Sequence, residues 1–287
     1  MKKQIAATIG LAAMLLALVL VPAAGAQDAN FLIAAEGAPV LSWSRPASSA
    51  ALPAPAIVEP SLSPEAALEV FQKRAARQSA DLGAYTDWTT VEADLPATSQ
   101  HGQFRLRRSF AAPNSLAFDA IKFVGDGFVK TNVITRLLQS EAQSVKKGEG
   151  AGTAMNADNY KFSYKGVDDL WGQQVYVYQL KPREKRLGLF KGKIYLDMHS
   201  GRIRRAEGEM VKSPSFFVKK IRFTQDYAEF GDYSFPVHIH SQADTRIIGQ
   251  AIVDIYHGDY RARSVAEVHA EGPDGGRSTS TGDDNRQ

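Results

Sequence analysis

Hydrophobic and polar residues alternate with a period of two along much of the chain. Large apolar side chains take every second position, with the exception of Arg108, in four segments, 104–110, 160–164, 194–198 and 235–239. Polar or charged residues fill most of the positions between them, as Arg105 and Arg107 do. This alternation is typical of strands that bury one face.

Glycine-containing turn signals recur between these segments. Short strands joined by such turns indicate an antiparallel meander, because parallel strands would need long helical crossovers. About ten strands fit between the signals, and a sheet of that size curves into a partial barrel. The signals are GDG at Gly125, HSGR at His199, GDY at Gly231 and HGDY at His257.

Two segments have helical spacing. In the first, Ser63 is a candidate N-cap and Pro64 suits the first helical position. The second, in residues 130–148, ends at a Lys-Lys-Gly sequence that is typical of a helix C-terminus. We expect both helices to cover part of the sheet. The apolar residues are Leu68, Phe71, Ala75 and Leu82, with Gly83 as C-cap, and then Ile134, Leu137, Leu138, Ala142 and Val145.

The two ends of the chain differ in composition from its middle. Residues 1–26 have a basic start, an apolar run and small residues at Ala24-Gly25-Ala26, which predicts a signal peptide cleaved after Ala26. An uncleaved membrane anchor is the alternative. Residues 27–62 are rich in Ala, Pro and Ser and indicate a linker, whereas residues 267–287 indicate a disordered tail. One domain, residues 63–266, lies between them.

Composition narrows the functional classes. The chain has no cysteine, which excludes disulfides, thiolate metal sites and a lipid-modified N-terminal cysteine. Removal of Lys2 and Lys3 with the signal peptide would lower the formal net charge from +3 to +1. A nearly neutral protein carries no electrostatic footprint for nucleic acid, so we expect no nucleic-acid partner.

The densest polar cluster lies in GKIYLDMHSGRIRRAEG, residues 192–208. Ser200-Gly201 is a candidate tight turn between two strands, because Gly201 can adopt a positive φ. Asp197 and His199 would then lie on one face of the incoming strand, with Arg202 and Arg204 on the same side of the outgoing one. Opposite charges across antiparallel strands stabilise a hairpin. We interpret the cluster as the polar side of a hairpin.

The candidates for catalysis are few. His238 and His240 share one face of a predicted strand, and His257 could complete a metal site if its strand is a neighbour. A metal-assisted hydrolase using these histidines is therefore the enzymatic alternative. The same histidines also fit the outer face of a half-buried strand. No GxSxG motif is present, and the Gly-rich GEGAG at Gly148 follows a helix, which is not the setting of a phosphate-binding strand–loop–helix.

Two arginines occupy unexpected positions. Arg108 falls in register with Phe104, Leu106 and Phe110, on the apolar face of its strand. A charge there must be paired or must point into a wet cavity. Arg205, beside Ile203, raises the same question. A rim position with the aliphatic stem over apolar surface is the alternative for both.

Four stretches of the chain resemble a known family: GDGFVKTNVITRLLQSE, NYKFSYKG, VYVYQLKPREKRLGLFKGKIYLDMHSGRIRRAEGEMVKSPSFFVKKIRF and FPVHIHSQADTRIIGQAIVDIYHGDY. Together they cover most of residues 104–260. They resemble the LolA-like superfamily of periplasmic lipoprotein carriers, in particular proteins labelled outer membrane lipoprotein-sorting protein. The resemblance implies an α+β, mainly β fold, in which a curved antiparallel sheet forms an unclosed β-barrel covered by two or more helices.

The resemblance also implies a periplasmic carrier for lipid or lipoprotein acyl chains, acting in lipoprotein sorting without catalysis and without a cofactor. We expect a monomer that contacts lipid, acylated lipoprotein or envelope proteins; a non-catalytic envelope interaction module is a further alternative. The concave face is expected to hold the ligand, although the same residues could instead fill a core. The candidates are Phe104, Leu106, Arg108, Phe110, Tyr160, Phe162 and Tyr164.

Overall fold

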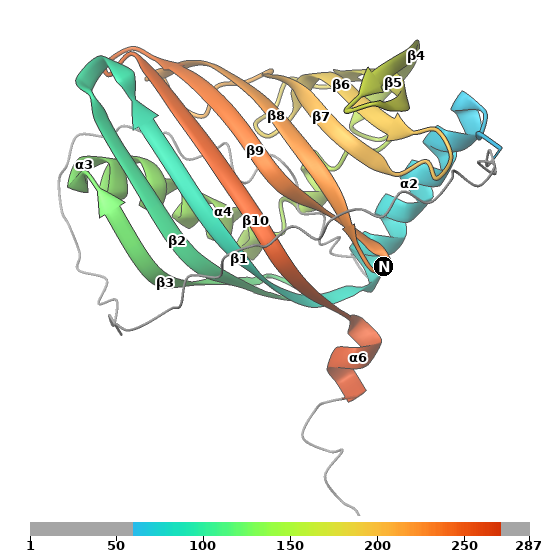
Figure 1. The fold of residues 1–287 in the computed structure, drawn as a ribbon, viewed down its shortest axis with the longest axis horizontal. Helices are drawn as coiled ribbons and strands as arrows, with labels where there is room; N and C mark the ends of the chain where they lie inside the picture. Colours follow the sequence, from blue (N-terminus) through green and yellow to red (C-terminus); the bar gives the residue numbers. More distant parts are fainter. Residues whose placement is uncertain (1–59, 271–287) are drawn as a thin grey trace, which may run out of the picture.

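A computed structural model of the chain describes residues 60–270. The predicted signal peptide, nearly all of the predicted linker and most of the predicted tail lie outside the described residues. The described part contains one ten-stranded antiparallel sheet and several helices (Figure 1). This architecture confirms the predicted fold class, a curved sheet that does not close into a barrel.

Strands that are neighbours in the sheet are also consecutive in the chain, with the exception of β1 and β10. Their order in the sheet is β3-β2-β1-β10-β9-β8-β7-β6-β5-β4, so β1 pairs with β10 and the edges are β3 and β4. The bounds are β1 Leu82–Leu95, β2 Gln100–Ala111, β3 Ser115–Gly125, β4 Tyr160–Leu170, β5 Gln173–Pro182, β6 Phe190–Asp197, β7 Ile203–Met210, β8 Val218–Phe230, β9 Tyr233–Thr245 and β10 Gln250–Ser264.

The two edges of the sheet are consecutive strands in the chain, so the segment between β3 and β4 must cross the opening of the barrel. That segment contains α3, Gly127–Val129, a π-helical turn over Lys130–Ile134, α4, Thr135–Lys147, and α5, Gly150–Thr153. The π turn and α4 bury Val133, Ile134, Leu137 and Leu138 against the sheet. The helical segment therefore covers the mouth of the barrel because the topology requires it.

Helix α2, Pro64–Asp81, precedes the sheet and lies near β6 and β7 (Figure 1). Ser63 caps it as predicted, since its Oγ accepts a hydrogen bond from the Ala66 N–H at 3.2 Å. The predicted C-cap at Gly83 is wrong: the helix ends at Asp81 and Gly83 lies in β1. A Cβ atom on Gly83 would lie 2.6 Å from the carbonyl oxygen of Ser264, so close packing against β10 requires glycine there.

One core joins the helices to the sheet. Ala67 and Phe71 of α2, the buried side chains of α4 and the inward residues of nine strands belong to the same apolar cluster. A second, aromatic cluster contains Tyr85, Phe110, Phe235 and Tyr260. The alternation in β2 is confirmed, because Arg105 and Arg107 are exposed while their neighbours in sequence are buried.

The ends of the domain differ slightly from the predicted boundaries. Leu62, assigned to the linker, is held by the domain: its N–H donates to the Met198 carbonyl at 2.8 Å. The helix α6, Val265–Ala270, includes the first residues of the predicted tail. None of the helices between residues 60 and 270 combines the length and apolar character needed to cross a membrane.

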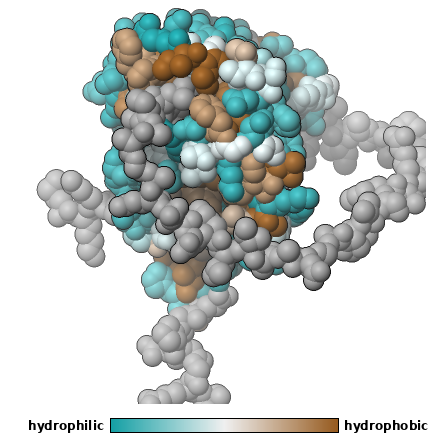
Figure 2. All heavy atoms as spheres, turned by 90° about the vertical axis from the view of Figure 1, so that its left-hand side faces the viewer, coloured by the Kyte–Doolittle hydropathy of each residue, from teal (hydrophilic) through white to brown (hydrophobic). Residues whose placement is uncertain are grey.

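Edge strand β3 and the adjoining α3 expose apolar side chains. Ile121 is 48%, Val124 51% and Phe128 38% exposed. Figure 2 views this side of the molecule and shows hydrophobic residues interspersed with hydrophilic ones. Single exposed apolar residues are common on soluble proteins, so this edge alone does not define a site.

Candidate functional site: a cavity beneath helix α2

The C-terminal half of α2 covers a cavity of about 440 Å³ above β7, β8 and β9. Volumes of this order are typical of small-molecule sites. Its apolar lining comes from three parts of the chain: Phe71 and Ala75 on α2, Ala154 and Met155 after α5, and Ile203, Tyr227 and Pro236 on the sheet. We call it the α2 cavity.

The sequence of α2 explains why space remains there. Residues facing the sheet on successive turns are Phe71, Ala75 and Ser79, so one large side chain is followed by two small ones. Phe71 fills its part of the interface and is buried, whereas Ala75 is too small to reach the strands. The cavity is therefore encoded by small residues on the second half of the helix.

The N-terminal half of α2 is held tightly. The Tyr176 hydroxyl donates to the Leu62 carbonyl at 2.6 Å, and the Tyr178 hydroxyl donates to the Pro64 carbonyl. The β6–β7 turn also packs against this half: a Cβ on Gly201, which has φ +65°, would lie 2.9 Å from the Ala67 carbonyl oxygen. This end of the helix is fixed by backbone contacts.

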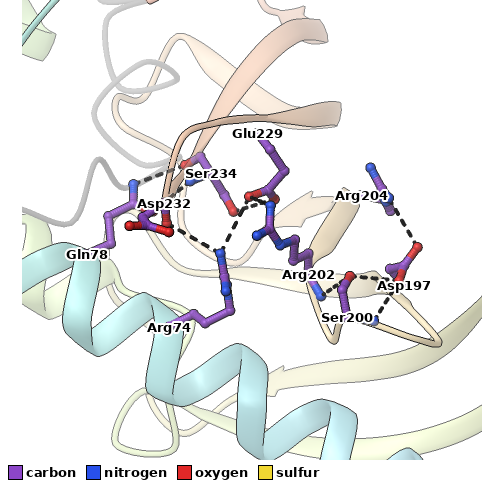
Figure 3. A network of polar contacts seen from close by, with 9 residues as sticks. All are labelled: Arg74, Gln78, Asp197, Ser200, Arg202, Arg204, Glu229, Asp232 and Ser234. Carbon is purple, nitrogen blue, oxygen red and sulfur yellow. Dashed lines mark hydrogen bonds and ion pairs between the residues drawn. The ribbon is translucent and has the colours of Figure 1, made fainter. Parts of the chain in front are cut away.

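The C-terminal half is held by polar side chains at the rim of the cavity (Figure 3). Gln78 exchanges two hydrogen bonds with the backbone of Ser234, at 3.0 and 2.9 Å. Arg74 donates to the Asp232 carbonyl at 3.4 Å and lies 3.7 Å from the Glu229 carboxylate, which also binds Arg202. Pairs this close to solvent contribute about 0.2–1 kcal/mol each. We call these contacts the polar rim.

Tyr227 provides a polar group inside the cavity. Burial raises the pKa of its hydroxyl, so the group stays protonated at neutral pH. Its ring packs against the main core. The hydroxyl has no recorded hydrogen-bond partner between residues 60 and 270, and it can therefore donate to a ligand.

The cluster that the sequence singled out is a hairpin, as predicted. Strands β6 and β7 pair antiparallel around Ser200-Gly201, and Arg204 donates to Asp197 at 3.1 Å. Arg205 makes a bidentate pair with Asp226, at 2.6 and 3.1 Å. The polar side of the predicted hairpin thus carries cross-strand ion pairs.

Arg108 is the centre of a fully buried polar network. Its guanidinium donates to Asp87 at 2.9 Å, to Glu141 of α4 at 2.8 Å and to the Tyr260 hydroxyl at 3.2 Å. Although burial alone would raise the pKa of Asp87, Arg108 and hydrogen bonds leave it below its ordinary value. Burial dominates at Glu141 and raises its pKa. The prediction that this arginine must be paired or must face a wet cavity is met by pairing.

His257 extends the buried network. Its Nδ1 lies 2.8 Å from the Thr89 hydroxyl and 3.1 Å from Asp87, while Nε2 is buried and has no partner among the described residues. Burial, followed by the nearby Arg108 charge, lowers the pKa of His257 to about 4. The ring is therefore neutral at pH 7, with its proton on Nδ1. The side chains of Arg108, Asp87 and His257 are fully buried, so a substrate cannot reach them.

The three histidines of the enzymatic alternative do not converge. His238 and His240 share a face, as predicted, and both lie 2.9 Å from Asp254. His257 points to the opposite, buried face, because it is an odd number of residues from Asp254 on β10. Within the part of the chain that the structure describes, no group of three or more His, Cys, Asp or Glu residues could hold a metal ion.

The seven residues predicted to line the concave face are divided among several environments. Phe104, Leu106 and Tyr160 are buried in the main core, and Phe162 is half-buried against it. None of the seven is among the residues that line the α2 cavity. The others are Phe110 in the aromatic cluster, Arg108 in the buried network and Tyr164, 44% exposed on edge strand β4.

Comparisons with known proteins leave the function open. A model of a family of unknown function, DUF5686, matches residues 153–262, less than half of the chain. A search of curated proteins gives no match.

Among solved structures, the chain resembles a protein described as an outer membrane lipoprotein-sorting protein domain from Vibrio parahaemolyticus, at 14% identity and TM-score 0.39, covering 72% of this chain and 96% of that one. It also resembles a LolA superfamily protein from Nitrosomonas europaea, at 10% identity and TM-score 0.36, covering 70% and 94%. A DUF1329 family protein from Desulfovibrio piger matches at 8% identity and TM-score 0.38, covering 69% and 92%. These likenesses are too distant to carry an argument about ligands.

Proposed function

We propose that this protein is an exported, non-catalytic carrier that holds an acyl chain of a lipid or lipoprotein in the α2 cavity. The observation that carries the proposal is the cavity itself, a space between a helix and the concave face of an open barrel, with apolar side chains from both in its lining. Burial of an acyl chain there contributes about 0.8 kcal/mol per methylene. Binding of this kind needs no catalytic group.

The two halves of α2 suggest how a ligand enters. The first half is fixed by contacts to its backbone, and the second is held by the polar rim, by a hydrogen bond from the Tyr233 hydroxyl to Asp81 at 2.7 Å and by contacts of small side chains. Because each rim contact contributes about 1 kcal/mol or less, the second half can move from the sheet at modest cost. We propose that it acts as a lid that opens by moving away from β8 and β9.

Ala75→Phe tests the proposal by filling the cavity. A phenyl ring displaces the space of at least two methylenes, so affinity for a fluorescent fatty acid should fall about tenfold or more. Ala266→Phe, on the exposed face of α6, is the matched control and should leave binding unchanged. Equal binding by wild type and Ala75→Phe, with both folded by circular dichroism, would contradict the assignment.

Export belongs to the same proposal. The carrier would act in the periplasm after cleavage at Ala26, as the first residues predict. Intact-mass measurement of the exported protein tests this step. A mass that still includes residues 1–26 would exclude cleavage and favour an anchored protein.

A further inference from the structure

A second and larger cavity, of about 1010 Å³, lies between α4 and the loops that precede β6 and β8. We call it the α4 cavity. Its lining contains four basic side chains, Arg136, Lys147, Arg186 and Lys212, and one acidic side chain, Glu149. The four basic residues come from three separate segments of the chain, and the fold brings these segments to one cavity.

Arg186 is held in place inside this cavity. Its Nη2 donates to the side-chain oxygen of Asn159, whose amide in turn donates to the carbonyls of Ala151 and Ala154 at 3.0 and 2.8 Å. The Arg186 Nε is buried and has no hydrogen-bond partner among residues 60–270. A guanidinium held in place by Asn159 is pre-organised, so little side-chain freedom is lost when it binds an anion.

Lys212 adds a second cation without a partner of its own. It is exposed, and no ion pair or hydrogen bond is recorded for it within residues 60–270. Arginine and lysine together suit phosphate, since guanidinium forms directed hydrogen bonds and ammonium acts as a point charge.

The α4 cavity and the α2 cavity share one wall. Gly152 and Thr153 line the α4 cavity, whereas Ala151, Ala154 and Met155 line the α2 cavity. The short α5 segment thus separates a cavity with four basic side chains and one acidic side chain from a cavity whose mixed lining includes Phe71, Met155 and Ile203. A lipid with a phosphate headgroup has an anionic part that suits the first cavity and an apolar part that suits the second.

We propose that the α4 cavity binds a phosphate group through Arg186 and Lys212, and that the ligand of the carrier is a phosphate-bearing lipid whose acyl chain occupies the α2 cavity. The second part rests on the proposed function, and the first does not. The same phosphate chemistry is offered by free phosphate monoesters, so the test includes one.

Dioctanoyl phosphatidic acid and dioctanoylglycerol form a matched pair of probes that differ in the phosphate group alone. By calorimetry, the full exported chain should bind the phosphatidic acid at least about tenfold more tightly, because hydrogen bonds to charged groups are the strong ones. Lys212→Gln and Arg186→Gln should each reduce this preference and leave dioctanoylglycerol binding intact. Lys161→Gln, on exposed β4 outside the cavity, is the control.

The outcomes separate the two proposals. Equal affinity for both lipids in wild type would overturn the phosphate site and leave the carrier function standing. Binding of glycerol 3-phosphate that depends on Arg186 and Lys212, with no binding of either lipid, would support the phosphate site and overturn the carrier. Failure of all three probes to bind would overturn both. Lys212 forms no ion pair or hydrogen bond with another of residues 60–270. The Lys212 variant should therefore fold even if the Arg186 variant does not.

Discussion

At the scale of single residues, Arg108 joins two strands and the covering helix through one guanidinium group. Its partners come from β1, α4 and β10, so these three elements are tied to β2, which carries Arg108, at one buried point. Removal of one partner from a buried ion pair leaves an uncompensated charge, which costs far more than an exposed charge does. The network therefore positions α4 across the mouth of the barrel.

Arg108→Met should lower the free energy of unfolding by about 3–5 kcal/mol, because Asp87 and Glu141 lose their cation. Arg107→Met is the matched control on the exposed face of the same strand, and it should change stability by less than about 0.5 kcal/mol. Urea denaturation measures both. Similar small losses in the two variants would show that the buried network does not hold the helix.

His257 gives the protein a predictable pH dependence. Its pKa is lowered to about 4 in the folded chain, whereas an unfolded histidine titrates near 6.5. The unfolded state therefore binds more protons between these values, and stability should fall as the pH drops from 6.5 towards 4. Between pH 7 and pH 5 the loss attributable to His257 should be on the order of 1–2 kcal/mol.

His257→Asn removes this titration while it keeps a donor near the Nδ1 position. The difference in slope between wild type and variant, measured by denaturation at several pH values, isolates the histidine. Equal slopes would contradict the lowered pKa. Glu141 acts in the opposite direction, because its raised pKa favours the folded state at acidic pH and this contribution is lost as the pH rises through its folded value.

At the scale of elements, hydrophobic periodicity predicted the architecture well. Alternation of apolar residues identified the strands, and the cap at Ser63 and the Gly148 terminus located both helices. Period and turn chemistry are local properties, so a sequence carries them directly. The same local information placed the Ser200-Gly201 hairpin and the shared face of His238 and His240.

The sites depend on contacts between segments that are far apart in the chain. Local sequence patterns predict such contacts only in part. Glu141 lies three residues after Leu138, on the apolar stripe of α4, and this position could have identified it as the partner of Arg108. The large aromatic residues of the strands do not indicate the α2 cavity. The residues in the sequence that indicate it are small ones, Ala75, Ala76, Ser79 and Ala80, which follow Phe71 on α2.

Edge strand β4 allows the core and pocket interpretations of the predicted residues to be compared. Phe162 is half-buried, packs against the main core and lies outside the α2 cavity. Phe162→Ala should therefore lower stability by about 2–3 kcal/mol, somewhat less than for a fully buried ring, without altering acyl-chain binding. Lys161→Ala, its exposed neighbour, is the control. A clear change in lipid affinity would return Phe162 to the binding site.

At the scale of the whole molecule, topology and function are connected by the gap between β3 and β4. Because these consecutive strands lie at opposite edges, the helical segment between them must cross the opening, and α5 comes to lie between the two cavities. Residues 71–80 of helix α2 cover the α2 cavity. An open sheet with helices across its mouth thus provides enclosed space without a large rearrangement of the core.

Photocrosslinking tests most directly whether the acyl chain lies in the α2 cavity. A fatty acid with a diazirine near its methyl end would be bound, illuminated and mapped by peptide mass spectrometry. We predict crosslinks in residues 71–80, 151–156 and 227–236, which line the α2 cavity. Crosslinks confined to Phe104, Phe110 or Phe162 and their neighbours would contradict this location and place the ligand among the residues of β2 and β4.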